Sequence, residues 1–227
     1  MTAQDLCFKS VRRLQWGSFQ ANEKPVTGSE RQNPKPFKIG NIDIANPVLL
    51  APMSGVTDAP FRRLTAALGA GLVISEMTAS DDLVNGRPMS RLRCEATGIG
   101  PHVVQLAGCE VRWMAEGARI AESAGAEIID INMGCPARHV TGGQSGSALM
   151  RDLDHALKLI EATIAAVKVP VTLKMRLGWD ERSLNAPELA RRASPGAFSE
   201  RSSQPSRIFK VTGTFTAEIV ASISFSA

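Results

Sequence analysis

The chain has 227 residues, of which 44% are hydrophobic and 21% charged, a balance typical of a globular protein. Apolar runs such as residues 47–51 fall far short of the roughly 20 residues that a membrane span needs, and residues 1–9 lack the apolar core of a secretory signal. These features exclude a transmembrane protein. The four cysteines form no CxxC pair, which argues against a zinc site and favours the reducing cytoplasm.

The net charge of +4 is concentrated near the N-terminus. Residues 1–38 contain seven Lys or Arg residues and three Asp or Glu residues, whereas residues 39–193 sum to −1. The first segment is also rich in Gln, Asn, Pro and Ser and shows no sustained periodicity. We therefore expect residues 1–37 to form a flexible basic arm. Its basic charge fits either a solubilising leader or a nonspecific contact with RNA.

From residue 38 onward, short apolar strands alternate with amphipathic helices, a pattern that predicts βα repeats around a parallel sheet. The expected strands are residues 48–51, 72–76, 102–106, 127–132 and 171–175. Cap residues and helical periodicity predict helices that start at Thr57 or Asp58 and end before Gly69, and helices over residues 111–123, 153–167 and 185–194.

Polar residues recur at the C-terminal ends of the expected strands, and βα barrels place their chemistry at this edge. They are residues 52–54, Glu76, Gln105, residues 132–135 and residues 174–176. A doubly wound sheet would also bind ligands there, but no glycine-rich GxGxxG loop follows the first strand. The pattern therefore favours an α/β protein with a TIM-type (β/α) barrel.

The most informative stretch is residues 130–136, Asp-Ile-Asn-Met-Gly-Cys-Pro. Its strand ends in Asn132, Gly134 permits an unusual turn, and Cys135 follows on a loop restrained by proline. A lone cysteine is commonly a small buried hydrophobic residue. The alternative is a catalytic thiol, either paired with His139 as a nucleophile or kept protonated as a general acid.

Two further strand-end residues also allow two interpretations. The Lys174 ammonium, if it points into a barrel, needs an anion, which is either the carboxylate of Asp130 or Glu76 or an anionic ligand or electron-rich cofactor ring. The Gln105 amide could bond barrel backbone groups or the edge of a bound ring.

Taken together, these segments resemble the tRNA-dihydrouridine synthases, specifically their bacterial nitrogen-regulation-like branch. The resemblance runs from about residue 38 to residue 193, with its motifs in the order of the family. The segments that carry it are residues 51–58, 60–62, 75–77, 105–108, 130–136, 146–150, 174–176 and 178–179.

The resemblance implies an FMN-dependent barrel followed by a helical domain that contacts tRNA. Pro52, Met53 and Ser54 match the family segment that lines the flavin. Gln105 matches the residue that hydrogen-bonds the flavin ring, and Lys174 matches the lysine beside its pyrimidine edge.

By the same resemblance, NADPH reduces FMN, hydride passes to C6 of uracil, and the Cys135 thiol protonates C5. Asn132 and Arg176 match positions that approach the substrate uridine. The implied partners are tRNA and NADPH, without a metal or a membrane. The target base must leave its stack to reach such a site.

Beyond residue 193 the motifs of the family are no longer recognisable. We therefore expect residues 38–193 to supply only the first five to six βα units of the barrel, and residues 194–227 to form a non-matching tail. On this basis three functions stay open. They are a tRNA-dihydrouridine synthase, an inactive fragment or noncatalytic RNA-binding remnant of that family, and an FMN barrel acting on a free pyrimidine.

Overall fold

The computed structural model describes residues 35–193. The expected basic arm, residues 1–37, lies outside the described residues except for its last three positions. The expected tail, residues 194–227, lies wholly outside them. Phe37, which we placed at the end of the arm, is the first residue of strand β1.

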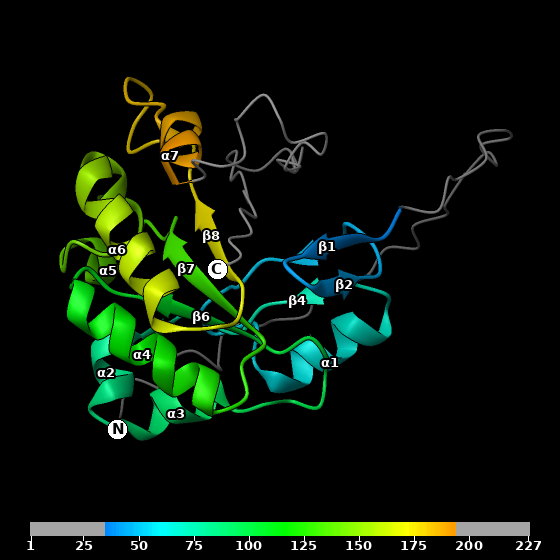
Figure 1. Ribbon diagram of the computed structural model, residues 1–227. Coiled ribbons are helices and arrows are strands. Elements are labelled where there is room, and N and C mark those ends of the chain that lie inside the picture. Colours follow the sequence, from blue (N-terminus) through cyan, green and yellow to red (C-terminus); the bar gives the residue numbers. More distant parts are fainter. Residues whose placement is uncertain (1–34, 194–227) are drawn as a thin grey trace, which may run out of the picture. The chain divides into compact units, whose positions relative to one another are not determined.

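The described part begins with an antiparallel hairpin formed by β1 (Phe37–Ile39) and β2 (Ile42–Ile44). The chain reverses at Gly40, whose φ of 58° lies in the left-handed region that glycine adopts without strain. Ile39 and Ile44 are fully buried in a cluster with residues from the starts of the following parallel strands, namely Leu72, Ile74, Val103 and Ile128. The hairpin therefore covers the N-terminal ends of the parallel strands (Figure 1).

The strands that follow pair in parallel and in chain order. They are β3 (Leu49–Leu50), β4 (Leu72–Val73), β5 (Thr78–Ala79), β6 (Val103–Ala107), β7 (Ile128–Met133) and β8 (Val171–Met175). β3 pairs with β4, β5 to β8 form one sheet, and a single bridge from Ile74 to Val103 joins β4 to β6. A doubly wound sheet reverses its strand order, whereas a barrel adds each strand beside the previous one. The order confirms the predicted (β/α) barrel winding.

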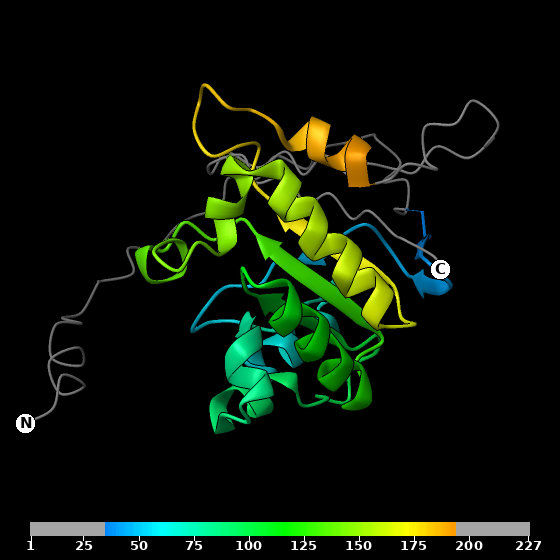
Figure 2. The same cartoon turned by 60° about the vertical axis from the view of Figure 1, so that its left-hand side comes forward.

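Four longer helices agree with the sequence prediction: α1 (Ala59–Ala67), α4 (Val111–Ser123), α6 (Leu153–Ala166) and α7 (Ala186–Ala193). The Asp58 carboxylate accepts a hydrogen bond from the Phe61 N–H at 2.9 Å, and Asp152 caps α6 in the same way. α4 and α6 lie side by side against one face of the sheet (Figures 1 and 2). Between sheet and helices lies the main apolar core, which includes Leu106, Ile131 and Leu173.

The sequence did not indicate the short helices α2 (Ser80–Val84), α3 (Pro88–Cys94) and α5 (Arg138–Thr141) or the 3₁₀ turn Gly146–Arg151. Each spans at most two turns, too short a window for a helical periodicity to stand out. No helix within residues 35–193 is long and apolar enough to cross a membrane. The same residues contain no group of three or more His, Cys, Asp or Glu side chains that could hold a metal ion.

The hairpin provides a test of this packing. We expect Ile44→Ala to lower the free energy of unfolding by about 2–5 kcal/mol, because it opens a cavity beside Ile74 and Ile128. Ile42→Ala is the matched control, since Ile42 is the same residue type two positions earlier and only half-buried. Chemical denaturation measures both variants, and an equal loss would show that the hairpin does not seal the end of the sheet.

Candidate functional site

The face of the sheet opposite α4 and α6 carries polar residues in two layers. Side chains alternate between the two faces of a strand, so the strands that present Leu106, Ile131 and Leu173 to the helices present polar neighbours on the other face. The register aligns these neighbours across strands. The first layer is Gln105, Asp130 and Thr172, and the second contains Asn132 and Lys174.

Hydrogen bonds connect the two layers. Asp130 accepts from the Gln105 amide and from the Thr172 hydroxyl, each at 2.6 Å. The Asn132 amide donates in turn to the Gln105 carbonyl oxygen at 2.8 Å. Since Gln105 and Asp130 are 0% and 1% exposed, these bonds replace the water that the groups lose on burial.

Asp130 is the centre of this network electrostatically as well. Burial raises the pKa of Asp130 above its ordinary value, and the hydrogen bonds from Thr172 and Gln105 and the positive charge of Lys174 oppose that rise. Of the two carboxylates that the sequence predicted as partners of Lys174, Asp130 has a pKa that the Lys174 charge lowers. Glu76 instead lies 3.4 Å from the Arg93 guanidinium.

The loop that carries Cys135 is held by Asn132. The side-chain oxygen of Asn132, Oδ1, accepts hydrogen bonds from the backbone N–H groups of Gly134 and Cys135 at 3.1 and 3.0 Å. On the other side of the loop, the Cys135 carbonyl accepts from the Ser147 N–H at 3.0 Å. The half-buried Cys135 is thereby fixed directly after the C-terminal end of β7.

Lys174 reaches this loop from the neighbouring strand. Its ammonium nitrogen would lie only 3.3 Å from a Cβ atom added to Gly134, so a side chain at position 134 would crowd it. The backbone nitrogen of Arg176 lies 3.8 Å from the same point. The structure thus brings Asn132, Cys135 and Lys174 together around Gly134, with Arg176 following at the end of β8.

The predicted flavin-lining segment, residues 52–54, follows β3. The Met53 N–H donates to the Thr57 hydroxyl at 3.0 Å, and the Met53 carbonyl accepts from the N–H groups of Val56 and Thr57. This turn leaves Pro52 half-buried and Met53 and Ser54 exposed. Among the described residues, no hydrogen bond joins the segment to Gln105 or Cys135.

Sequence reasoning did not include Thr172 in the site, and it assigned Gly146 and Ser147, although they lie in a segment that carries the family resemblance, no role beside Cys135. Thr172 precedes Lys174 by two positions, a spacing that places both on one face of a strand, so the signal for it was available. The role of Gly146 had no such signal, because only the folded loop brings it against the Cys135 carbonyl. His139 is exposed, and within residues 35–193 no hydrogen bond joins it to Cys135.

A family model described as dihydrouridine synthase (Dus) matches residues 49–197 of the chain. The chain belongs to the dihydrouridine synthase family. All the strand-end residues discussed above, from Pro52 to Arg176, lie within the matched range. The match confirms the family that the motifs indicate, and its range begins later than the predicted residue 38 and ends four residues beyond the predicted residue 193.

Individual relatives agree with this assignment. A probable tRNA-dihydrouridine synthase of Rhizobium leguminosarum bv. phaseoli is 66% identical over 152 residues, covering 67% of this chain and 48% of the relative. A protein of the same name from Rhodobacter capsulatus is 62% identical, with 69% and 49% covered. The tRNA-dihydrouridine synthase B of Xanthomonas campestris is 51% identical, with 68% and 47% covered. The chain thus spans about half the length of the curated relatives it matches.

The Asp130 network predicts a pH-dependent effect of Thr172→Val. This change leaves a buried carboxylate oxygen without its donor and should lower the free energy of unfolding by about 1–3 kcal/mol at neutral pH. Because burial raises the pKa of Asp130, the folded protein gains stability relative to the unfolded chain as pH falls and the carboxylate is protonated. The lost hydrogen bond favoured the ionised form, so the deficit should shrink as pH falls through that pKa.

Thr163→Val is the matched control for this experiment. The Thr163 hydroxyl is also buried but donates to the Leu159 carbonyl within α6. Its removal leaves no carboxylate without a donor, so the loss of folding free energy should be nearly independent of pH. Denaturation curves at several pH values compare the two variants. Parallel pH profiles for both would show that Thr172 does not stabilise an ionisable partner.

The Cys135 loop yields a second prediction at the site. Gly146 has a φ of 61°, and a Cβ atom there would lie 2.7 Å from the Cys135 carbonyl oxygen. Gly146→Ala should therefore displace the loop and cost about 1–3 kcal/mol of stability. We expect faster alkylation of Cys135 by iodoacetamide, followed by peptide mass spectrometry.

Gly143→Ala is the control in the same segment, because its added Cβ atom would make only an ordinary 3.5 Å contact with the Val140 carbonyl. Its alkylation rate should match that of the unsubstituted chain. If Gly146→Ala also leaves the rate unchanged, Gly146 does not determine the position of the Cys135 loop.

Proposed function

We propose that this chain carries the catalytic site of a tRNA-dihydrouridine synthase, which reduces uridines in tRNA to 5,6-dihydrouridine with FMN and NADPH. The observation that carries the proposal is the placement of Cys135, held by Asn132 on one side and Ser147 on the other, beside Lys174. The names of the Rhizobium and Rhodobacter relatives support the substrate.

The residues present fit a flavin. The polar face of the sheet offers a buried ammonium at Lys174 and an amide at Gln105, of which one N–H is engaged by Asp130. The second amide hydrogen of Gln105 makes no hydrogen bond within residues 35–193, and we assign it to an acceptor on the flavin ring. Lys174, Gln105 and residues 52–54 would hold FMN, and FMN when bound supplies the hydride that uracil receives at C6.

Lys174 contributes a positive charge in a buried environment. Such a charge stabilises negative charge more strongly there than it would in water. Asp130 offsets part of the cost of burying the ammonium when no anion is bound. We therefore assign Lys174 to the electron-rich ring of the flavin.

Cys135 serves as the general acid that delivers a proton from its Sγ atom to C5 of uracil. A general acid must be held within hydrogen-bonding reach of the atom it protonates, and the two N–H groups bound by Asn132 restrict the loop in the way this role requires. Asn132 also donates to Gln105 and Met77. Its amide atoms are thus all engaged, which favours a positioning role over direct contact with uridine.

Arg176 is the residue that we assign to the RNA side of the site. It follows β8 directly and is half-buried, so its guanidinium can meet a substrate group at the C-terminal edge of the strands. A uridine that leaves its stack to enter the site loses stacking energy of a few kcal/mol. Hydrogen bonds from a guanidinium to the base or its phosphate would offset part of that loss.

The role of Cys135 is tested with the chain saturated with FMN and supplied with NADPH and unmodified tRNA. Cys135→Ala should reduce dihydrouridine formation by about a hundredfold or more, because a positioned general acid contributes on that scale. FMN binding, followed by flavin absorbance, should not change. Dihydrouridine is quantified by mass spectrometry of tRNA nucleosides.

Cys109→Ala is the matched control, since Cys109 is also a half-buried free thiol, and its rate should equal that of the unsubstituted chain. A Cys135→Ala variant that retains the full rate would remove Cys135 from its proposed role. An FMN-saturated chain that forms no dihydrouridine would reject the proposed activity.

A further inference from the structure

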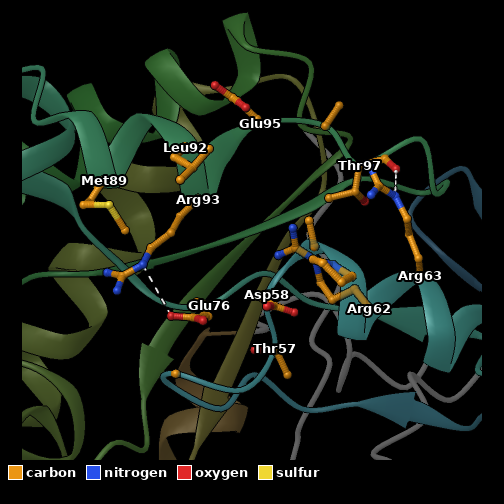
Figure 3. Close-up of a pocket in the computed structure, with 14 residues that line it drawn as sticks. Thr57, Asp58, Arg62, Arg63, Glu76, Met89, Leu92, Arg93, Glu95 and Thr97 are labelled. Atoms are coloured by element: carbon orange, nitrogen blue, oxygen red, sulfur yellow. Dashed lines mark hydrogen bonds and ion pairs between the residues drawn. The ribbon is translucent and has the colours of Figure 1, made fainter. Parts of the chain in front are cut away.

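A cavity of about 530 Å³ lies between α1 and α3, apart from the site at Cys135. The turn before α1, Glu76 and residues 95–97 complete its lining, and Figure 3 shows the side chains that enclose it. Neither Cys135 nor Lys174 lines this cavity. Its volume falls in the range of small-molecule sites in proteins, and the proposed reduction of uridine makes no use of it.

The cavity is lined by a largely buried arginine whose guanidinium makes no hydrogen bond within the described part of the chain. Arg62 projects from α1 toward the open centre in Figure 3 and is only 5% exposed. No side-chain hydrogen bond or ion pair of Arg62 exists within residues 35–193. Asp58 and Glu76 act on it electrostatically, yet desolvation still lowers the pKa of Arg62. A guanidinium carries five N–H donors, so an anion in the cavity would satisfy groups that the protein leaves unmatched.

The two other arginines of the lining are already held in place. The Arg63 Nε atom donates to the Thr97 carbonyl at 2.9 Å. Arg93 lies 3.4 Å from Glu76 and donates to the Met77 carbonyl. Among the lining arginines within residues 35–193, Arg62 is thus the one whose side chain makes no hydrogen bond or ion pair.

The wall on the α3 side exposes two apolar side chains. Met89 and Leu92 are 59% and 55% exposed, next to the charged Arg93 and Glu95, and Pro60 of α1 and Ala96 also line the cavity. An anion alone would fill a small part of the cavity and leave this wall in water. A ligand that joins an anionic group to a flat, weakly polar body would satisfy both sides.

We propose that this cavity binds a nucleotide unit, with its phosphate on Arg62 and its base against Leu92 and Met89. Phosphate suits the guanidinium because its oxygens accept parallel N–H···O bonds from the planar fork. The same chemistry is offered by a free mononucleotide and by a nucleotide within RNA. The binding does not require the thiol of Cys135.

Calorimetric titration of the whole chain with uridine monophosphate and with uridine tests the phosphate contact. We expect the monophosphate to bind at least about tenfold more tightly than the nucleoside. Arg62→Gln should abolish that difference, whereas Arg119→Gln should preserve it, because Arg119 is exposed on α4 and paired with Glu116. Equal affinity for uridine and its monophosphate in the unsubstituted chain would overturn the proposal, unless a phosphodiester of RNA is the ligand.

Short oligouridylate without terminal phosphates decides that last case. Tighter binding of this oligomer, lost in Arg62→Gln, assigns the site to RNA, and preference for the monophosphate assigns it to a free nucleotide. If neither ligand binds in an Arg62-dependent way, the site does not exist as proposed.

Leu92→Glu keeps the test decisive if Arg62→Gln fails to fold, because Leu92 is exposed and tolerates a polar side chain. Its added carboxylate should weaken phosphate binding by about tenfold, and unchanged affinity would overturn the proposal. Cys135→Ala should bind as the unsubstituted chain does. Loss of binding in that variant would place the ligand at the Cys135 site instead.

Discussion

The buried carboxylate of Asp130 is the constraint around which the site is built. It lies on the face of β7 that points away from the helices, where a charge without partners would destabilise the fold. Its oxygens are therefore bonded to neighbours on both sides, Gln105 from β6 and Thr172 from β8. These bonds can form only when β6, β7 and β8 are paired in this register. The polar network on the face opposite α4 and α6 therefore depends on the order of the strands in the sheet.

The network also orders the loop that carries Cys135. Asn132 connects Gln105 on one side with the N–H groups of Gly134 and Cys135 on the other. Displacement of any member changes what the next one can bond, because each amide has few donors and acceptors to reassign. The position of the loop that carries Cys135 thus depends on buried groups of strands β6 and β7.

Arg62 presents the contrasting case of a buried charge that the protein does not complete. Asp130 has two short hydrogen bonds and the charge of Lys174 nearby, whereas the guanidinium of Arg62 has only the more distant fields of Asp58 and Glu76. Burial of both groups carries a desolvation cost. The difference in partners is the physical reason to assign Asp130 to structure and Arg62 to a ligand.

Much of this was readable from the sequence. The alternation of apolar strands and capped helices predicted the order of the βα units, and strands β7 and β8 and helices α4 and α6 lie within two residues of their predicted bounds. The strand-end motifs identified the dihydrouridine synthase family and predict Cys135 and Lys174 as its reactive and cationic residues. These features are local, because periodicity, caps and motifs act over a few neighbouring residues.

What the tertiary structure decided concerns pairs of residues that are far apart in the chain. Three such features depend on register and on packing between elements. They are the two partners of Asp130, the approach of Gly146 to the Cys135 carbonyl, and the absence of a hydrogen bond on the Arg62 side chain within residues 35–193. No spacing in the sequence encodes such distances. The residue types in the sequence therefore determined which chemical groups the site contains. The positions of these residues relative to one another followed from burial and from the pairing of the parallel strands.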